Sequence, residues 1–217
     1  IADAVLKRKL KGKGAVLIEG PKWCGKTTTA EQIAGSILYM SEPENAKENM
    51  LLADINPRKL LEGATPRLID EWQTAPKLWD AVRFEVDHRD KLGQFILTGS
   101  SVPPSTDEIV HSGTGRFAWI KMRPMSLFES GDSTGAVSLA DLFNTPEQIF
   151  AENKLEIENL SYLICRGGWP LATELEKDIA LDQAFDYYDA VVNSDISRAD
   201  NVTRNPERVK RLMKSYA

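Results

Sequence analysis

The sequence predicts an α/β fold in which a parallel sheet carries helices on both faces and is followed by a helical second region. Two observations predict the sheet: short apolar runs recur along the first 124 residues, and segments with helical spacing separate them. A third observation predicts the second region, because after about Pro124 the periodic segments are helical and no convincing strand pattern follows. We therefore expect a core over residues 1–124 and a helical region over residues 125–217.

Short apolar runs of this kind are typical of buried parallel strands. They cover residues 15–19, 66–71, 94–98 and 117–122. Helical patterns are expected in the core over residues 26–38 and 78–86. In the second region the helical patterns cover residues 126–130, 138–143, 146–151, 154–166, 178–196 and 206–217.

Composition excludes several classes of protein. Of the 217 residues, 42% are hydrophobic and 27% charged, which excludes disordered, collagen-like and low-complexity chains. The 27 Lys and Arg against 32 Asp and Glu give a net charge of −5, so no overall positive field recruits nucleic acid or a membrane surface. We expect no autonomous nucleic-acid binding and no membrane partner. Two cysteines and the lack of a run of about 20 apolar residues favour a cytoplasmic location.

The most specific motif follows the first apolar run and fits the pattern G-x-x-x-x-G-K-[ST]. Its residues are Gly20, Pro21, Lys22, Trp23, Cys24, Gly25, Lys26 and Thr27, with Thr28 next in the expected helix. The glycines let successive backbone N–H groups point inward at phosphate oxygens. Lys26 can reach the β- and γ-phosphates, and the Thr27 hydroxyl can ligate Mg²⁺. The motif predicts binding of ATP or ADP with Mg²⁺; the structural alternative is a glycine-rich turn with a surface lysine.

An acidic pair ends the second apolar run. In a parallel sheet, Asp70 at the carboxyl end of its strand would lie beside the bound metal and hold Mg²⁺ through water. Glu71 next to it can orient and deprotonate the attacking water. The structural alternative is a solvated strand end, which such a pair commonly is.

Two further positions qualify for the chemistry of the γ-phosphate. Either Thr98 or Ser100 can sense the γ-phosphate, because Thr98 ends the third apolar run and Ser100 follows it by two positions. The structural alternative is a strand end that enters a turn. Arg116 follows a loop of small residues and precedes a strand. In a homo-oligomer it can supply positive charge to a neighbour's site as an arginine finger, with a structural salt bridge as the equal alternative.

Taken together, these motifs resemble the AAA+-related P-loop ATPases of bacteria and archaea that carry a restriction-endonuclease-like C-terminal domain. The matching segments are residues 20–27, 68–73, 75–76, 95–100, 111–116, 122–129 and 167–170. The resemblance implies an ATPase core followed by a helical lid, with Pro170 against the adenine; a helix stop is the structural alternative at 167–170. It also implies a winged-helix segment and a nuclease-like domain after Ala217. The start at Ile1 and the uncapped helical end agree that the sequence is a piece of a longer protein.

Four functions are weighed for these residues. The leading hypothesis is Mg²⁺-dependent ATP binding and hydrolysis, slow in isolation and coupled to conformational change of an attached domain. In the alternative, ATP occupancy gates binding of an unknown protein partner with little or no turnover. A small-molecule kinase usually has a lid with several arginines, whereas residues 130–165 contain none. A GTPase is disfavoured because the chain lacks an Asn-Lys-x-Asp element.

Overall fold

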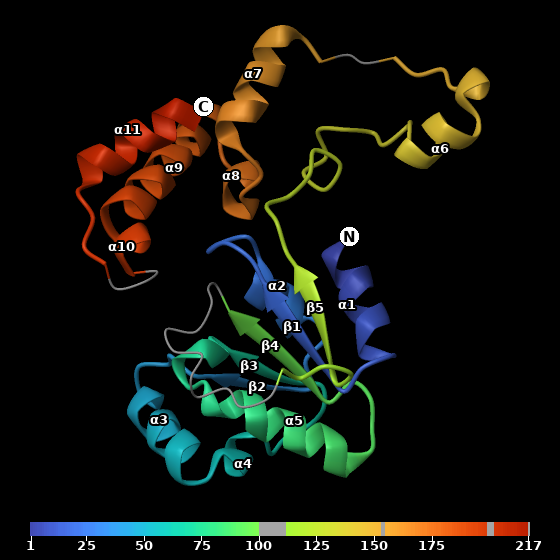
Figure 1. The fold of residues 1–217 in the computed structure, drawn as a ribbon. Helices are drawn as coiled ribbons and strands as arrows, with labels where there is room; N and C mark the ends of the chain where they lie inside the picture. The colour runs from blue at the N-terminus through green and yellow to red at the C-terminus, as the bar shows by residue number, and fades with distance from the viewer. Residues whose placement is uncertain (100–111, 153–154, 199–201, 217) are drawn as a thin grey trace. The chain divides into compact units, whose positions relative to one another are not determined.

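The computed structural model describes residues 1–217 except 100–111, 153–154, 199–201 and 217 (Figure 1). The chain divides into two compact units, Ile1–Arg123 and Pro124–Ala217. The first unit contains the sheet and the phosphate-loop motif, and the second is helical.

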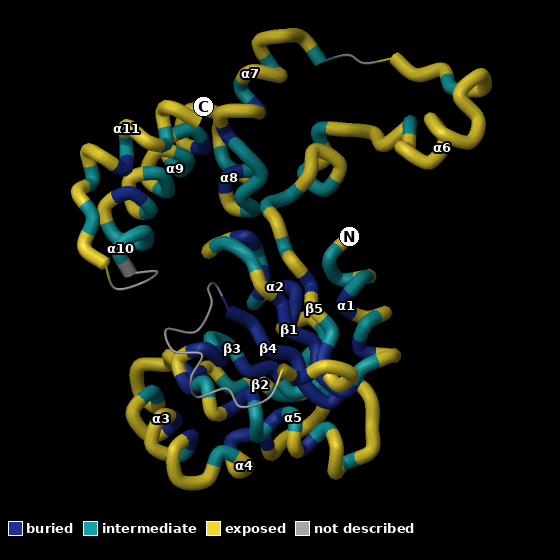
Figure 2. The backbone as a smooth tube through the Cα atoms, viewed as in Figure 1, coloured by how far each residue is buried: buried dark blue, intermediate teal, exposed yellow. Residues whose placement is uncertain are grey.

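A five-stranded parallel sheet forms the centre of the first unit, in the order β2-β3-β4-β1-β5. Its strands are β1 (Ala15–Glu19), β2 (Ser36–Tyr39), β3 (Arg67–Asp70), β4 (Phe95–Gly99) and β5 (Phe117–Lys121). The middle strands β1 and β4 are buried along almost their whole length (Figure 2). Burial on both faces explains why these strands are continuous apolar runs rather than alternating patterns. The predicted α/β class is confirmed.

Helices cover both faces of the sheet (Figure 1). On one face lie α1 (Ala2–Leu10) and α2 (Lys26–Glu31), and on the other α3 (Ala46–Ile55), α4 (Pro57–Leu60) and α5 (Lys77–Arg89). In β1, Val16 and Ile18 pack with the first layer, whereas Ala15 and Leu17 pack with the second. This division follows from the two-residue period of a strand, which sends successive side chains to opposite faces.

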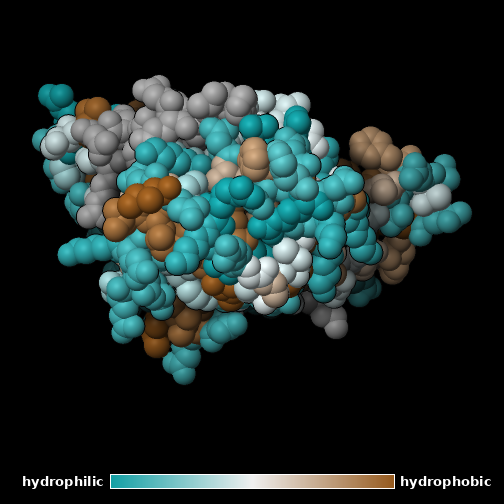
Figure 3. Space-filling view, turned by 90° about the horizontal axis from the view of Figure 1, so that it is seen from below, coloured by the Kyte–Doolittle hydropathy of each residue, from teal (hydrophilic) through white to brown (hydrophobic). Residues whose placement is uncertain are grey.

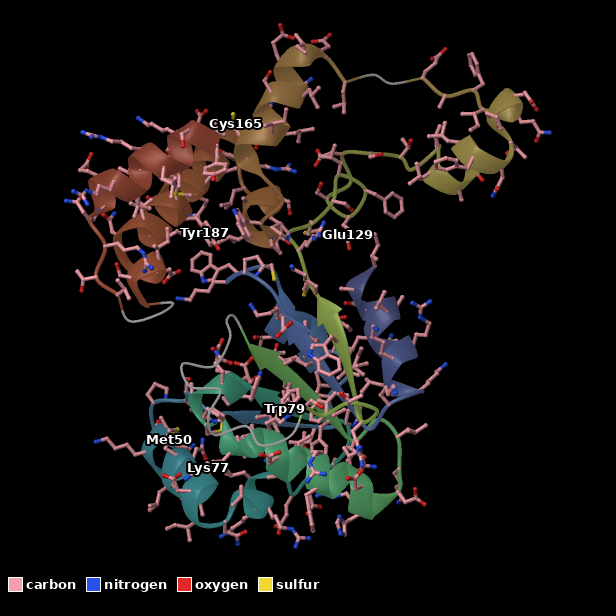
Figure 4. The ribbon with its side chains drawn as sticks, viewed as in Figure 1. Met50, Lys77, Trp79, Glu129, Cys165 and Tyr187 are labelled. Atoms are coloured by element: carbon pink, nitrogen blue, oxygen red, sulfur yellow. The ribbon has the colours of Figure 1, made fainter. Side chains whose placement is uncertain are left out.

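An aromatic cluster fills the second layer next to the sheet. Trp79 of α5 points toward the strands (Figure 4) and stacks on Phe117 with 4.0 Å between ring centroids. Trp72 lies 5.1 Å from Trp79, also between centroids. The cluster therefore joins the turn after β3 to α5 and to the start of β5.

Helices alone make up the regular structure of the second unit, as far as the structure describes it. They are α6 (Leu139–Asn144), α7 (Ile157–Arg166), α8 (Pro170–Glu174), α9 (Lys177–Ala190), α10 (Ile196–Arg198) and α11 (Pro206–Tyr216), with a 3-10 turn η2 (Pro146–Gln148) and a π-helical turn η3 (Val191–Asp195). Helix α9 packs against both α7 and α8. Tyr187 of α9, labelled in Figure 4, contacts Trp169. Their ring centroids are 4.3 Å apart.

Several local expectations are wrong. The helix expected over residues 26–38 ends at Glu31, and residues 36–39 form β2 instead. The run of threonines after Lys26 has low helix propensity. Residues 36–39 form a strand because they pair in parallel with β3. Residues 126–130 form turns, in which Glu129 accepts hydrogen bonds from the backbone and hydroxyl of Ser126. Of residues 146–151, only 146–148 are helical.

Seen from below, the surface is largely hydrophilic, and its hydrophobic residues lie in separate patches (Figure 3). Among the described residues, no helix combines the length and the hydropathy that crossing a bilayer requires.

Candidate functional site

The phosphate-loop motif forms the turn between β1 and α2. Gly25 has a φ of 93°, which favours glycine, and it lies directly before the first residue of α2. Gly20 passes so close to β5 that a Cβ there would lie 2.4 Å from the Met122 carbonyl oxygen. The first and last fixed glycines are therefore required by the backbone path, which supports the curled loop that the motif predicts.

Lys26 is buried at the start of α2, with 6% of its surface exposed. Its Nζ donates hydrogen bonds to the carbonyl oxygens of Gly20, at 3.0 Å, and Pro21, at 2.8 Å. The ammonium group thus contacts the backbone of the phosphate loop. Oxygens of a bound anion can take the place of these two carbonyl oxygens as its hydrogen-bond acceptors. A buried lysine whose hydrogen-bond partners, among the residues that the structure describes, are neutral carbonyls is suited to a negatively charged ligand.

Asp70 receives hydrogen bonds from two threonines of different elements. Thr27 of α2 donates to Oδ1 at 2.8 Å, and Thr98 of β4 donates to the same oxygen at 2.6 Å. The sheet register explains this meeting, because Thr98 is paired with Asp70 on one side and with Ile18 on the other. The three strand ends therefore deliver the acid, the buried hydroxyl and the phosphate loop to one edge of the sheet.

The residues present fit a magnesium ion that also binds phosphate. Thr27 Oγ1 and Asp70 Oδ1 lie 2.8 Å apart, so a hydroxyl and a carboxylate, both oxygen donors of the kind that Mg²⁺ prefers, are adjacent beside the phosphate loop. Mg²⁺ usually takes one or two protein oxygens and completes its shell with phosphate and water. Among the described residues, no group of three His, Cys, Asp or Glu could hold a metal alone.

Glu71 has an unusual backbone and a fixed carboxylate. Its φ of 56° places it in the left-handed region, which a residue with a Cβ rarely adopts. The 3-10 turn η1 (Trp72–Thr74) follows immediately. Glu71 Oε2 accepts a hydrogen bond from Nε2 of Gln73. Uncommon backbone conformations of this kind gather at functional sites.

Other predicted ligand residues of the loop differ in exposure. Trp23, with a φ of 64°, is 67% exposed, and Lys22 and Thr28 are also exposed. Cys24 is buried, and burial raises the pKa of its thiol against the lowering effect of Lys26, which keeps the thiol protonated. Ser100 lies outside the described residues, so the choice of γ-phosphate sensor between it and Thr98 stays a prediction.

Arg116 lies at the opposite edge of the sheet from the phosphate loop, because it precedes β5. Its Nε donates to Asp87 Oδ1 at 2.8 Å and its second terminal nitrogen to Asp87 Oδ2 at 3.2 Å. This paired hydrogen bond raises the pKa of the guanidinium and lowers that of the Asp87 carboxyl. Both residues line an open pocket of about 350 Å³. Arg116 is thus excluded from its own chain's site, and its role toward a neighbour stays a prediction.

Pro170 belongs to the second unit, where it is the first residue of α8. The nearby Arg166 is buried and donates to Asp132 Oδ2 at 2.8 Å. Its guanidinium is therefore engaged within the second unit. The contact of Pro170 with adenine stays a prediction.

Two residues for which the sequence predicts no role contact predicted site residues. Gln73 contacts Glu71, and Asp87 contacts Arg116. The sequence signal for Gln73 is its position two residues after Glu71, close enough for its amide to contact the acid within one turn. No local pattern points to Asp87, which is separated from Arg116 by 29 positions.

A profile of the AAA domain family matches residues 12–130, which is more than half of the chain. The chain belongs to the AAA domain family. Its phosphate loop and acidic pair both lie within the matched residues. The first unit is accordingly an AAA-type P-loop ATPase domain, of a family associated with nucleotide binding.

Two curated relatives, uncharacterized proteins of Mycobacterium bovis and Mycobacterium tuberculosis, are each 30% identical over 134 residues. The match covers 61% of this chain and 30% of each relative's length. Among solved structures, a single-substitution variant of Thermotoga maritima RuvB aligns at a TM-score of 0.38, with 16% identity over 98% of this chain and 67% of that chain. C. elegans PCH-2 aligns at a TM-score of 0.36, also with 16% identity, over 88% of this chain and 60% of that chain. Likeness of this extent assigns no ligand or partner to the chain.

Proposed function

We propose that the first unit binds ATP with Mg²⁺ and hydrolyses it, and that the cycle changes the conformation of an attached C-terminal domain in the full-length protein. The observation that carries the proposal is the convergence of Thr27 and Thr98 on Asp70 beside a phosphate loop that holds a buried lysine. An ammonium group, a hydroxyl and a carboxylate at one sheet edge are the groups that a magnesium-bound triphosphate requires.

Each residue has a separate task in this proposal. Lys26 exchanges its carbonyl partners for phosphate oxygens, while Thr27 and Asp70 hold the metal, directly or through water. Bound Mg²⁺ neutralises charge on the phosphates. Glu71 accepts a proton from the water whose oxygen bonds to the γ-phosphorus. As that bond forms, the bond from the γ-phosphorus to the bridging oxygen breaks, which leaves ADP and inorganic phosphate.

Calorimetric titration with ATP and ADP, with and without Mg²⁺, tests the binding half of the proposal. The parent protein should bind both nucleotides, and Lys26→Ala should lose most of the affinity for ATP because no other charge replaces the ammonium. Lys47→Ala, on the exposed side of α3, is the matched control and should bind as the parent does. Parental ATP affinity in Lys26→Ala would contradict the site.

Steady-state hydrolysis by Glu71→Gln tests the chemical half. We expect kcat to fall by about 10²-fold or more, because a general base contributes that much, with ATP affinity retained. Equal rates in the variant and the parent, together with intact ATP binding, would favour a nucleotide-gated module without turnover.

A further inference from the structure

Gln73 is a buried amide that contacts the candidate base. It lies in the middle of the η1 turn, with 7% of its surface exposed, and its Nε2 donates to Glu71 Oε2. A carboxylate only accepts hydrogen bonds, so the amide nitrogen, and not the oxygen, must face Glu71.

The other end of the same amide is left without a partner. Gln73 Oε1 is buried and finds no hydrogen-bond partner among the residues that the structure describes. A buried acceptor without a partner is rare and lowers stability, because it loses its water without a replacement. Turning the amide over would remove its hydrogen bond to Glu71. The observed orientation therefore favours contact with the carboxylate over stability.

The end of β4 is shaped around this side chain. A Cβ at Gly99 would lie 2.5 Å from Gln73 Oε1 and 3.2 Å from Nε1 of Trp72. Glycine at this position leaves the space that the amide occupies. Gly99 follows Thr98, the donor to Asp70, and is paired with the last residue of β1, directly before the phosphate loop.

The backbone of Glu71 is held independently. Its carbonyl oxygen accepts hydrogen bonds from the Thr74 backbone, at 3.0 Å, and from the Thr74 hydroxyl, at 2.9 Å. These contacts anchor the left-handed turn at Glu71 but leave its carboxylate free to rotate. Gln73 supplies the constraint that the side chain lacks.

We propose that Gln73 is a positioning residue for hydrolysis: its amide holds the Glu71 carboxylate in the orientation that accepts the proton of the attacking water. The proposal rests on the proposed function, because it assigns Gln73 to the same site. Gln73 Nε2 donates to Glu71 Oε2, which leaves the other carboxylate oxygen of Glu71 to take the proton.

The test uses Gln73→Met, which keeps the length of the side chain and loses the donor. Gln94→Met is the matched control, because Gln94 is also buried but lies at the other end of β4. We expect Gln73→Met to bind MgATP within about twofold of the parent while kcat falls by about tenfold or more. The control should change neither kcat nor the affinity for MgATP.

A merely structural role would lower MgATP affinity and kcat together, whereas a positioning role lowers kcat alone. Parental kcat in Gln73→Met overturns the proposal, and so does a loss of MgATP binding equal to the loss of rate. Gln73→Ala is the second variant, should the first not fold: it removes both the donor and the buried acceptor, and should also lower kcat at retained affinity. Retained kcat in Gln73→Ala overturns the proposal as well.

Glu71→Gln, measured alongside, separates the two levels of inference. If the parent does not hydrolyse ATP, or if Glu71→Gln is as active as the parent, the proposed function fails, and the positioning role fails with it. If Glu71→Gln is impaired and Gln73→Met is not, only the positioning role fails.

Discussion

The Thr27 hydroxyl donates a hydrogen bond to Asp70 Oδ1 at 2.8 Å, although 43 positions separate the two residues. Thr27 is the second residue of the helix after the phosphate loop, and Asp70 is the last residue of β3. Their contact therefore depends on the parallel arrangement of β1, β4 and β3, which brings all three carboxyl ends to one edge. It is the contact from which the metal site is inferred.

Removal of the Thr27 hydroxyl should weaken binding of MgATP more than binding of metal-free ATP. Thr27→Ala loses one metal ligand, and we expect the affinity for MgATP to fall about tenfold, which corresponds to about 1.4 kcal/mol. Thr27→Ser keeps the hydroxyl and should stay within about twofold of the parent. Calorimetry with and without Mg²⁺ measures both values, and an equal loss in the two conditions would contradict the ligand role.

Thr98 should contribute to stability as well as to the site, because its side chain is buried and bonded to Asp70. Thr98→Val keeps the shape but leaves Asp70 with one donor fewer. We expect the free energy of unfolding to fall by about 1–2 kcal/mol, measured by urea denaturation. Thr98→Ser retains the donor and should lose less. The reverse order of the two variants would mean that packing rather than the hydrogen bond holds this position.

Arg116 should act on a neighbouring subunit, since it lies at the opposite edge of the sheet from its own phosphate loop. Arg116→Ala should lower ATPase activity with ATP affinity unchanged. Mixing Arg116→Ala with Glu71→Gln should restore part of the activity, because one interface then combines an intact base with an intact arginine.

Asp87→Asn is the control for the ion pair that Arg116 makes within its own chain. This variant releases the guanidinium without removing it, so its activity should not fall. If the mixture of Arg116→Ala and Glu71→Gln is no more active than the sum of the two variants measured separately, the arginine-finger role is contradicted. The structural salt bridge to Asp87 then remains as the role of Arg116.

Glu85 should make stability depend on pH. Burial acts to raise the pKa of this carboxyl, but hydrogen bonds from Arg89 and Arg58 outweigh it and lower the pKa overall. A lowered folded-state pKa means that the stabilisation is complete above the unfolded value of about 4.3 and is lost as the pH falls through the folded value.

Glu85→Gln should therefore be less stable than the parent at pH 7, by about 1–2 kcal/mol, with the difference closing below pH of about 4. Glu48→Gln, an exposed position on α3, is the control and should show no such convergence. Urea unfolding at pH values from 7 to 3 measures both variants. A difference that stays constant over this range would contradict the ion-pair explanation.

The sequence by itself determined the local parts of this protein. The apolar runs at 15–19 and 94–98 correspond closely to β1 and β4, because strands buried on both faces need apolar side chains at every position. The phosphate loop is equally local: its glycines, lysine and threonine are consecutive, and the turn that they form depends on neighbouring residues alone. The extent of α2 was not local, since pairing with β3 decided where β2 begins.

Only the tertiary structure decided which distant residues meet. Strand order and register bring Thr98 to Asp70, and the packing of η1 against the end of β4 buries Gln73 beside Glu71. The pairing of Arg116 with Asp87 likewise requires α5 to cover the sheet face next to β5. The physical reason is that local patterns fix the conformation of short segments, whereas contacts across many positions depend on how the whole chain packs.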